Sequence, residues 1–570
     1  MARLIARLRA SWLPPWLLLI LIVALSLQTG NAADAPHSSQ DDTAGEGGDQ
    51  ADEAPADPQR PAPSAADLQA RYRLASADPE SLPFTPPRLP DLGQYTAERM
   101  ANKVSRVPKG SASVASLLNE PGFKSLTSAI GQGLSELAVR QHGGLRAIFV
   151  EHGHQRLADL ARSLPAELFE QTSPGIYLAR LPILVRHGAT LEIGPEVREL
   201  RLSQDRGAML AVEGTLYLHG SRLIGWNEAA RRPAWFKSEK EFRPFVVAWG
   251  GSHTWIAGST IAHLGYASTK AFGLSLSQYS TTVAQRAVWQ RPTGWILDSE
   301  ITDLWYGFYT WEADDVVLKG NRLHGNILYG IDPHDRSRRL IIAGNEATGT
   351  RRKHGIIISR DVDDSFILGN RSHGNKLSGI VLDRQCSGNV IADNLTYGNG
   401  SDGIVLSESP DNLVWNNLSS GNRHHGIRLR NSTGVRIQGS SAIANGLAGI
   451  YGVSRDLAGT GRDLHEDPYR KALSMDIVGG QLTGNGSGPI NLDAPDTVAL
   501  YGIDLRTPQR ELGYRFGGAL LPFQIEMLDV MVRQKRVVIL EPLPLARLEP
   551  PSPALRVPVA LNPRPSPAIP

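Results

Sequence analysis

Short apolar strands recur along the middle of the chain with a nearly constant spacing. Each strand begins with a glycine followed by an apolar residue, and successive glycines lie 25, 24, 24, 23 and 23 positions apart. These glycines are Gly330, Gly355, Gly379, Gly403, Gly426 and Gly449. Self-similarity at this period is typical of a solenoid, in which each repeat buries the apolar face of its neighbour.

A second series of corner residues runs in step with the first and follows short apolar strands. Its members are Gly320-Asn321, Gly344-Asn345, Gly369-Asn370, Asp393-Asn394 and Asn416-Asn417. Because Gly and Asn tolerate a left-handed backbone, both series predict turns, and we expect Asn370 and Asn375 to be structural corners. Leucine-rich repeats share the period, but their Leu-x-x-Leu-x-Leu-x-x-Asn core is missing. The predicted fold is all-β, a right-handed parallel β-helix.

The rest of the chain divides by composition around this solenoid. Arg3, Arg7 and Arg9 precede the apolar stretch 16–25, and small residues follow it, which is the layout of a cleavable secretory signal. An uncleaved N-terminal anchor is the alternative. The stretch is shorter than the about 20 residues that a membrane span needs, so no span is expected after cleavage. The expected organisation is a signal peptide 1–33, a disordered Ala/Pro/acidic linker 34–69, a mixed N-terminal capping segment 70–185, the β-helix with a catalytic groove 186–515, a C-terminal cap 516–549 and a Pro-rich tail 550–570.

Two segments near the C-terminus depart from the repeat. Residues 454–472 interrupt it with a long loop, which we expect to be able to close over the groove. Residues 521–532 have helical spacing, which predicts a cap on the final coil.

Charge and cysteine content exclude several classes of function. The formal net charge is +2, so we expect no nucleic-acid partner, and any preference for a polyanion must come from a local patch. The single cysteine, Cys386, excludes an intrachain disulfide and a Cys-based zinc site, and we expect a buried thiol. No spaced metal-ligand box, Ser nucleophile elbow or phosphate loop is present in the sequence, so neither a metal nor a cofactor is expected.

The repeat register identifies one unusual strand. Counting from each glycine, positions +1 and +3 are apolar and face inward, so positions +2 and +4 face outward. In the first coil the outward positions are Asp332 and His334. Pro333 lies between them, although proline cannot donate to a strand ladder. Such a departure from the local rule is typical of a functional site.

Stacking of neighbouring coils, about 4.8 Å apart, gathers further polar groups beside this strand. Position −1 places Tyr329 next to His354, and position −2 adds Lys353. Position +5 places Asp335 next to Arg360, if the strand ends there and Arg360 emerges at the corner. More basic residues lie on the same or adjoining coils, and together they predict a positive stripe; a solvated charged face is the alternative for the outer ones. They are Arg351, Arg352, Arg384, Arg423, Arg428 and Arg430.

These residue types suit proton abstraction next to a carboxylate. Histidine is a base of near-neutral pKa, carboxylates can orient its ring, and a cation can neutralise the substrate's acid group so that the carbanion delocalises into it. An acidic polysaccharide with a carboxylate at C5 of its sugars meets this description.

The run Tyr329-Gly330-Ile331-Asp332-Pro333-His334-Asp335 resembles the signature of the mannuronan (alginate) C5-epimerases. Lys353-His354-Gly355 is similar to the basic-His-Gly motif one coil later, and the resemblance covers roughly residues 190–530. It implies a periplasmic isomerase that converts β-D-mannuronate to α-L-guluronate residues within alginate. The extracellular members carry calcium-binding nonapeptide repeats that this sequence lacks, so calcium dependence does not transfer.

The resemblance also implies roles for individual residues. His334 would remove the C5 proton, Arg360 would neutralise the sugar carboxylate, and water or Tyr329 would return a proton to the opposite face. Asp332 and Asp335 would hold the tautomer of His334 or shape the strand. The expected catalytic residues are therefore His334, Arg360, Asp332, Asp335 and Tyr329, and the expected substrate-binding residues are Lys353, His354, Arg352, Arg384, Arg428 and Arg430.

Two other functions remain open from the sequence. A polysaccharide lyase begins with the same proton abstraction but then expels the C4 oxygen. A non-catalytic scaffold or guard could instead hold the polymer during export. Either function is compatible with partners in an alginate export or biosynthesis complex.

Overall fold

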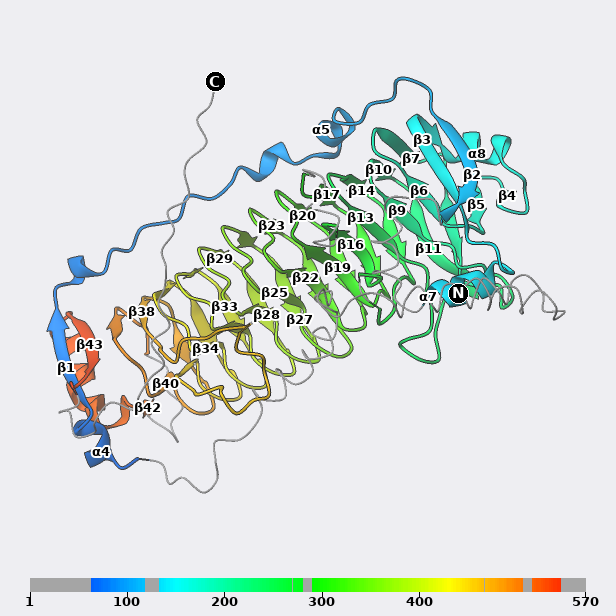
Figure 1. Ribbon diagram of the computed structural model, residues 1–570. Coiled ribbons are helices and arrows are strands. Elements are labelled where there is room, and N and C mark those ends of the chain that lie inside the picture. The colour runs from blue at the N-terminus through cyan, green and yellow to red at the C-terminus, as the bar shows by residue number, and fades with distance from the viewer. Residues whose placement is uncertain are drawn as a thin grey trace, which may run out of the picture.

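The computed structural model describes residues 63–117, 133–268, 270–279, 290–465, 467–505 and 515–544. The expected signal peptide, most of the expected linker and the Pro-rich tail lie outside the described residues. Figure 1 shows a long parallel β-helix with a short cap at each end.

Three parallel ladders form the walls of the β-helix. Ladder A consists of β3 (Arg146–Arg156), β7 (Ala189–Ile193), β10 (Thr215–His219), β14 (His253–Ala257), β17 (Thr293–Leu297), β20 (Val317–Lys319), β23 (Ile341–Ala343), β26 (Phe366–Leu368), β29 (Val390–Ala392), β32 (Leu413–Trp415), β35 (Val435–Gln438), β38 (Met475–Val478) and β41 (Val498–Tyr501). Ladder B consists of β3, β6 (Ile183–Val185), β9 (Leu210–Val212), β13 (Val246–Trp249), β16 (Gly273–Ser277), β19 (Tyr306–Trp311), β22 (Tyr329–His334), β25 (Ile356–Ser359), β28 (Ile380–Asp383), β31 (Ile404–Ser407), β34 (Ile427–Arg430), β37 (Ile450–Val453), β40 (Ile490–Asp493) and β42 (Gly517–Gly518). Ladder C consists of β5 (Ile176–Ala179), β8 (Glu199–Ser203), β11 (Arg222–Asn227), β15 (Thr260–Ala262), β18 (Glu300–Thr302), β21 (Arg322–His324), β24 (Glu346–Thr348), β27 (Arg371–His373), β30 (Leu395–Tyr397), β33 (Leu418–Ser420), β36 (Ser441–Ile443) and β39 (Leu482–Thr483).

The interior follows the predicted register. Ile331, Ile356 and Ile380 occupy position +1 of successive coils and are fully buried, which removes apolar surface from water along the whole axis. Asparagine side chains also stack inside the corners, as expected. Asn370 is buried, its Nδ2 donates to Asn394 Oδ1 at 3.0 Å, and Asn375 Nδ2 donates to Asn399 Oδ1 at the same distance. Each stacked amide thus satisfies the next.

The two glycine series have different structural roles, which corrects the prediction that both form turns with a left-handed backbone. Gly344 and its counterparts have a left-handed backbone, with φ +62° at Gly344, as expected for a turn. Gly330 does not. A Cβ at Gly330 would lie 2.4 Å from the backbone oxygen of Gly355, so this series keeps glycine because adjacent coils approach too closely for a side chain.

The N-terminal segment does not form a single cap, which corrects the prediction for residues 70–185. β1 (Tyr72–Ala77) pairs antiparallel with β43 (Val537–Pro542) at the far end of the β-helix. Residues 79–109, here called the strap, then run back along ladder A (Figure 1). The strap contains η1 (Pro79–Ser81), η2 (Leu92–Gln94) and α5 (Ala97–Ala101). β43 pairs antiparallel with β41 of the last coil, and β1 in turn covers the outer edge of β43. Both pairings matter because unpaired edges are costly.

Only residues from Ser111 onward close the N-terminal end. β2 (Ser111–Ser116) pairs antiparallel with β3, and β3 already belongs to the first coil, because it also pairs in parallel with β6 and β7. The β-helix therefore starts before residue 186. The other elements at this end are β4 (Phe169–Ser173), β12 (Arg232–Pro233), α7 (Gly133–Arg140) and α8 (Leu157–Ser163).

The expected disordered linker ends earlier than residue 69. α4 (Ala65–Gln69) begins at Ser64, whose side chain and that of Asp67 form a capping box, and Leu68 is buried. This helix lies beside η4 (Leu521–Phe523), which is followed by α10 (Gln524–Leu528) and the π-helical turn η5 (Asp529–Arg533). The helical spacing of 521–532 is confirmed as three short helical turns. No helix in the described part of the chain has both the length and the hydrophobicity of a membrane span.

Candidate active site

The strand β22 presents its polar side chains on the outer face of ladder B. It pairs with β19 on one side and with β25 on the other, where the direct pairs are Ile331 with Ile356 and His334 with Ser359. The pairing is interrupted between them, because Pro333 has no N–H to donate. Asp332 is 2% exposed, so the strand carries a nearly buried carboxylate two residues from a partly exposed imidazole.

His334 and Asp335 form the central polar pair of the site. His334 Nδ1 lies 2.8 Å from Asp335 Oδ2. Burial alone would raise the pKa of the Asp335 carboxyl, but the charge and hydrogen bond of His334, followed by the charges of Arg360 and Arg336, hold that pKa well below its ordinary value. Asp335 is therefore an acceptor, Nδ1–H of His334 is the donor, and Nε2 of the neutral ring is left with its lone pair.

A left-handed corner brings the carboxylate to the imidazole and confirms the expected end of the strand. Residues at position +5 of successive coils all have positive φ, and we call them the corner row: Asp335 (φ 32°), Arg360 (59°), Arg384 (57°), Glu408 (52°) and Asn431 (48°). Strict strand alternation would point the side chains at position +5 inward, and the left-handed backbone turns them outward instead. Arg360 therefore emerges one coil away from Asp335, at the edge of the outer face.

An aromatic and basic cluster lies at the other end of β22. The rings of Tyr329 and His354 stack with centroids 6.0 Å apart, and the Lys353 ammonium lies 5.5 Å from the centre of the Tyr329 ring. His354 Nδ1 accepts a hydrogen bond of 3.1 Å from the backbone N–H of Ser378. The neutral His354 ring therefore carries its proton on Nε2, as a hydrogen-bond donor.

Most of the outer arginines do not contribute to the expected positive stripe, because carboxylates pair with them. The paired ones are Arg351, Arg352, Arg384, Arg428 and Arg430. Arg428 belongs to β34, which is four strands beyond β22 in ladder B. Its Nε lies 3.0 Å from Asp402 Oδ2. Arg352 lies on the other side, 2.5 Å from Glu239 and over the Trp305 ring. These acids are distant in sequence, so the spacing of the basic residues alone could not reveal them.

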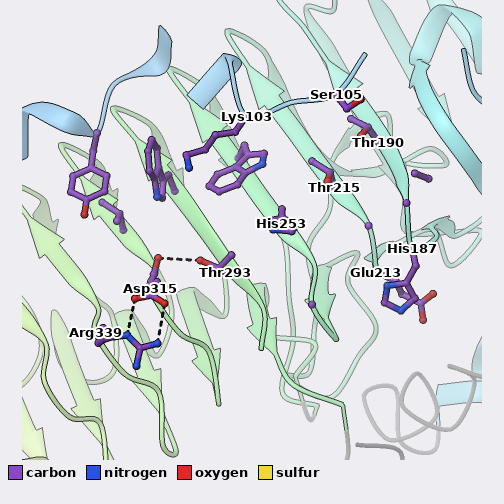
Figure 2. A pocket seen from close by; sticks show the side chains of 18 of the residues that line it. Lys103, Ser105, His187, Thr190, Glu213, Thr215, His253, Thr293, Asp315 and Arg339 are labelled. Carbon is purple, nitrogen blue, oxygen red and sulfur yellow. Dashed lines mark hydrogen bonds and ion pairs between the residues drawn. The ribbon is translucent and has the colours of Figure 1, made fainter. Parts of the chain in front are cut away.

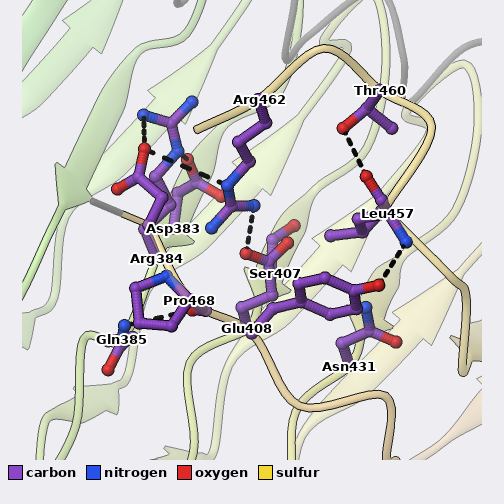
Figure 3. A network of polar contacts seen from close by, with 12 residues as sticks. Asp383, Arg384, Gln385, Ser407, Glu408, Asn431, Leu457, Thr460, Arg462 and Pro468 are labelled. Atoms are coloured by element: carbon purple, nitrogen blue, oxygen red, sulfur yellow. Dashed lines mark hydrogen bonds and ion pairs between the residues drawn. The ribbon is translucent and has the colours of Figure 1, made fainter. Parts of the chain in front are cut away.

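Residues 454–465 and 467–472, here called the corner loop, lie against the corner row (Figure 3). Asp467 Oδ2 lies 2.9 Å from Arg360 Nη2 and 3.1 Å from Arg384 Nη1. Glu408 Oε1 accepts from Arg430 Nη2 at 2.9 Å, and its other oxygen bonds to Arg462 of the loop.

Sequence reasoning missed Asp467, which lies in the insertion, and Glu408, although Glu408 occupies position +5 of the repeat, as Asp335 and Arg360 do. It also missed Tyr309 and Trp311 of β19, which lie directly beside Asp332 and His334 on the preceding coil. The Tyr309 and His334 rings lie 5.9 Å apart. Gly307-Phe308 lies 23 positions before Gly330-Ile331, so extending the glycine series by one coil would have found both aromatic residues.

A separate cavity lies under the strap on ladder A (Figure 2). Its volume is about 820 Å³, and Lys103 of the strap lies over the rings of Trp255 and Trp295 there. His253 and Thr293 also line it. Because it opens on a different ladder from His334, this cavity is not part of the arrangement around β22. Among the described residues, no group of His, Cys, Asp and Glu side chains is arranged to hold a metal ion.

Known proteins match this chain over most of its length. A family model of the right-handed β-helix region matches residues 290–457 and confirms the predicted handedness. A mannuronan C5-epimerase of Pseudomonas putida is 46% identical over 471 residues, which are 83% of this chain and 91% of that protein. The mannuronan C5-epimerase AlgG of Azotobacter vinelandii is 48% identical over 472 residues, which are 83% of this chain and 90% of that protein.

A solved structure agrees with these sequence relatives. The crystal structure of the periplasmic alginate epimerase AlgG aligns with a TM-score of 0.73 at 46% identity, and the match covers 74% of this chain and 100% of that one. The expected periplasmic location is confirmed by this similarity. With almost half of its residues identical to those of known epimerases over most of its length, the chain belongs to the mannuronan C5-epimerase family of isomerases.

Proposed function

We propose that this protein converts β-D-mannuronate to α-L-guluronate residues within alginate, with His334 as the base that removes the C5 proton. The observation that carries the proposal is the His334–Asp335 pair on the outer face of β22, with Arg360 at the next corner. The hydrogen bond to Asp335 leaves Nε2 of His334 able to accept a proton and stabilises the imidazolium that forms.

Charge development defines the role of Arg360. When the C5 proton leaves, its electron pair delocalises into the adjoining carboxylate, which gains a second negative charge. A guanidinium that pairs with that carboxylate lowers the cost of this step. Tyr329 or water then donates a proton to C5 from the opposite face, which inverts the centre without breaking the glycosidic bond. Lys353, His354, Arg352, Arg384, Arg428 and Arg430 remain the proposed contacts to the polymer.

Proton NMR of polymannuronate incubated with the purified protein tests this proposal. We expect guluronate signals from the wild type and none from His334→Ala. The matched control is His373→Ala, which removes a histidine that pairs with Glu346 at 3.2 Å on ladder C and should leave turnover unchanged. Full activity of His334→Ala would refute the role of the base.

Two other outcomes separate the alternatives. Unsaturated chain ends, detected by their ultraviolet absorbance, would show that the protein is a lyase that expels the C4 oxygen. Polymer binding by the wild type without any change in the sugar would favour a scaffold or guard in the export complex.

A further inference from the structure

The protein's own Asp467 carboxylate pairs with the Arg360 guanidinium, which the proposed mechanism assigns to the carboxylate of the substrate. Asp467 lies 2.9 Å from Arg360 and 3.1 Å from Arg384, and Arg462 Nε approaches the same oxygen to 3.9 Å. The Asp467 side chain is only 9% exposed. Three arginines therefore surround one buried carboxylate, which is the environment that a uronate carboxylate would need.

The corner loop is held in this position by several attachments. At its base, Asn431 Nδ2 donates to the Arg455 carbonyl at 2.8 Å, and the backbone N–H of Arg455 donates to Asn431 Oδ1 at 2.7 Å. Farther along, Arg462 bonds to Glu408, and Gln385 Nε2 donates to the Pro468 carbonyl at 3.1 Å (Figure 3). The loop thus follows the corner row from Asn431 toward the coil that holds the base.

We propose that Asp467 is a tethered competitor for the substrate carboxylate and makes the site selective for long uronate polymers over short ones. This inference rests on the proposed function, because it assumes that Arg360 receives the uronate carboxylate. A carboxylate that is tethered to its target by a flexible loop has a local concentration on the order of millimolar there. A short oligomer must compete with this concentration through few contacts, whereas a polymer adds contacts along the other coils that offset the displacement.

The alternative role for Asp467 is to position Arg360 for catalysis, and kinetics distinguish the two. We expect Asp467→Asn, which keeps the shape and removes the charge, to lower the KM of a short oligomannuronate by about tenfold and to leave kcat unchanged. The KM of polymannuronate should fall less. A loss of kcat at unchanged KM would instead show a positioning role and overturn the proposal, as would unchanged KM and kcat.

Asp456→Asn provides the matched control. Asp456 lies in the same loop, but its Oδ1 accepts from the Tyr469 hydroxyl at 2.5 Å rather than from an arginine. This variant should keep the wild-type preference for long chains. Equal melting temperatures of both variants and the wild type would show that the loop change did not unfold the β-helix.

Calorimetric titration separates failure of this inference from failure of the proposed function. The short oligomannuronate is titrated into His334→Ala with and without Asp467→Asn, so that no turnover occurs. Tighter binding to the double variant, by about tenfold, supports competition. Equal binding, in an enzyme whose wild type epimerises and whose His334→Ala variant does not, would overturn the inference alone.

Discussion

Replacing Asp335 with asparagine tests the electrostatic basis of the proposed mechanism. The His334 and Asp335 side chains are 14% and 16% exposed, so solvent screens the pair only partly. Two unit charges about 4 Å apart at an effective dielectric of about 20 interact by about 4 kcal/mol. The amide oxygen of asparagine would retain a neutral hydrogen bond worth about 1 kcal/mol. The loss at the imidazolium-forming step is therefore about 3 kcal/mol, or about two orders of magnitude in kcat.

The assay is the initial rate of guluronate formation at saturating polymannuronate, followed by proton NMR. Asp411→Asn is the control for the backbone, because Asp411 also has a left-handed conformation (φ 55°) but lies at a corner several coils away. It should retain wild-type turnover. An Asp335→Asn enzyme within about threefold of the wild type, which is less than 1 kcal/mol, would refute the claim that Asp335 stabilises the charged ring.

Three further predictions concern stability and the response to pH. Gly330→Ala should lower the free energy of unfolding by about 1–3 kcal/mol, because its Cβ would lie 2.4 Å from the backbone oxygen of Gly355. Chemical denaturation measures this change. The control Gly459→Ala should be neutral, because open space surrounds Gly459. Burial, opposed by Asp402 and aided by Arg428 and His424, lowers the pKa of His425 to about 4. Because the unfolded chain then binds more protons between about pH 6.5 and pH 4, stability should fall by up to about 3 kcal/mol as pH falls through this window, and His425→Gln should remove that slope; an unchanged slope would contradict the assignment. Burial and the charge of Asp383, opposed by Arg462, raise the pKa of Glu408 to about 7. Ionisation of Glu408 should therefore hold the corner loop more tightly as pH rises through 7, seen as higher amide protection factors in the loop. Glu408→Gln should show no such dependence.

The repeat made the centre of the site predictable. A period of 23 to 25 residues sets which positions stack, so the sequence alone predicts that Tyr329 lies beside His354 and Asp335 beside Arg360. The left-handed corner was needed to bring Arg360 outward, and arginine is not a residue that signals one, since it rarely adopts positive φ. That part of the prediction was an assumption which the structure confirmed.

Contacts outside the repeat could not be predicted in this way. Asp467 lies in an insertion, and its position depends on how the loop folds back rather than on any spacing. Glu239, which pairs with Arg352, lies far from it in sequence and outside the repeat positions, so its effect on the expected positive stripe was invisible. β1 has no apolar alternation strong enough to assign it to a sheet, because only Tyr72 of its six residues is buried.

The pairing of β1 with β43 has a consequence for how the molecule acquires its fold. Arg73 and Glu541, which are bonded across this pair, are 468 positions apart, whereas most strand pairs join neighbouring coils. Local pairs form early and distant ones late, because loop closure costs entropy before any contact repays it. The coils can therefore assemble in succession, while the strap settles along ladder A only after the last coil exists. Completion of the chain, rather than formation of the solenoid, then becomes the slow step. A protein truncated before β43 would expose both its terminal edge and the Trp255 and Trp295 rings under the strap.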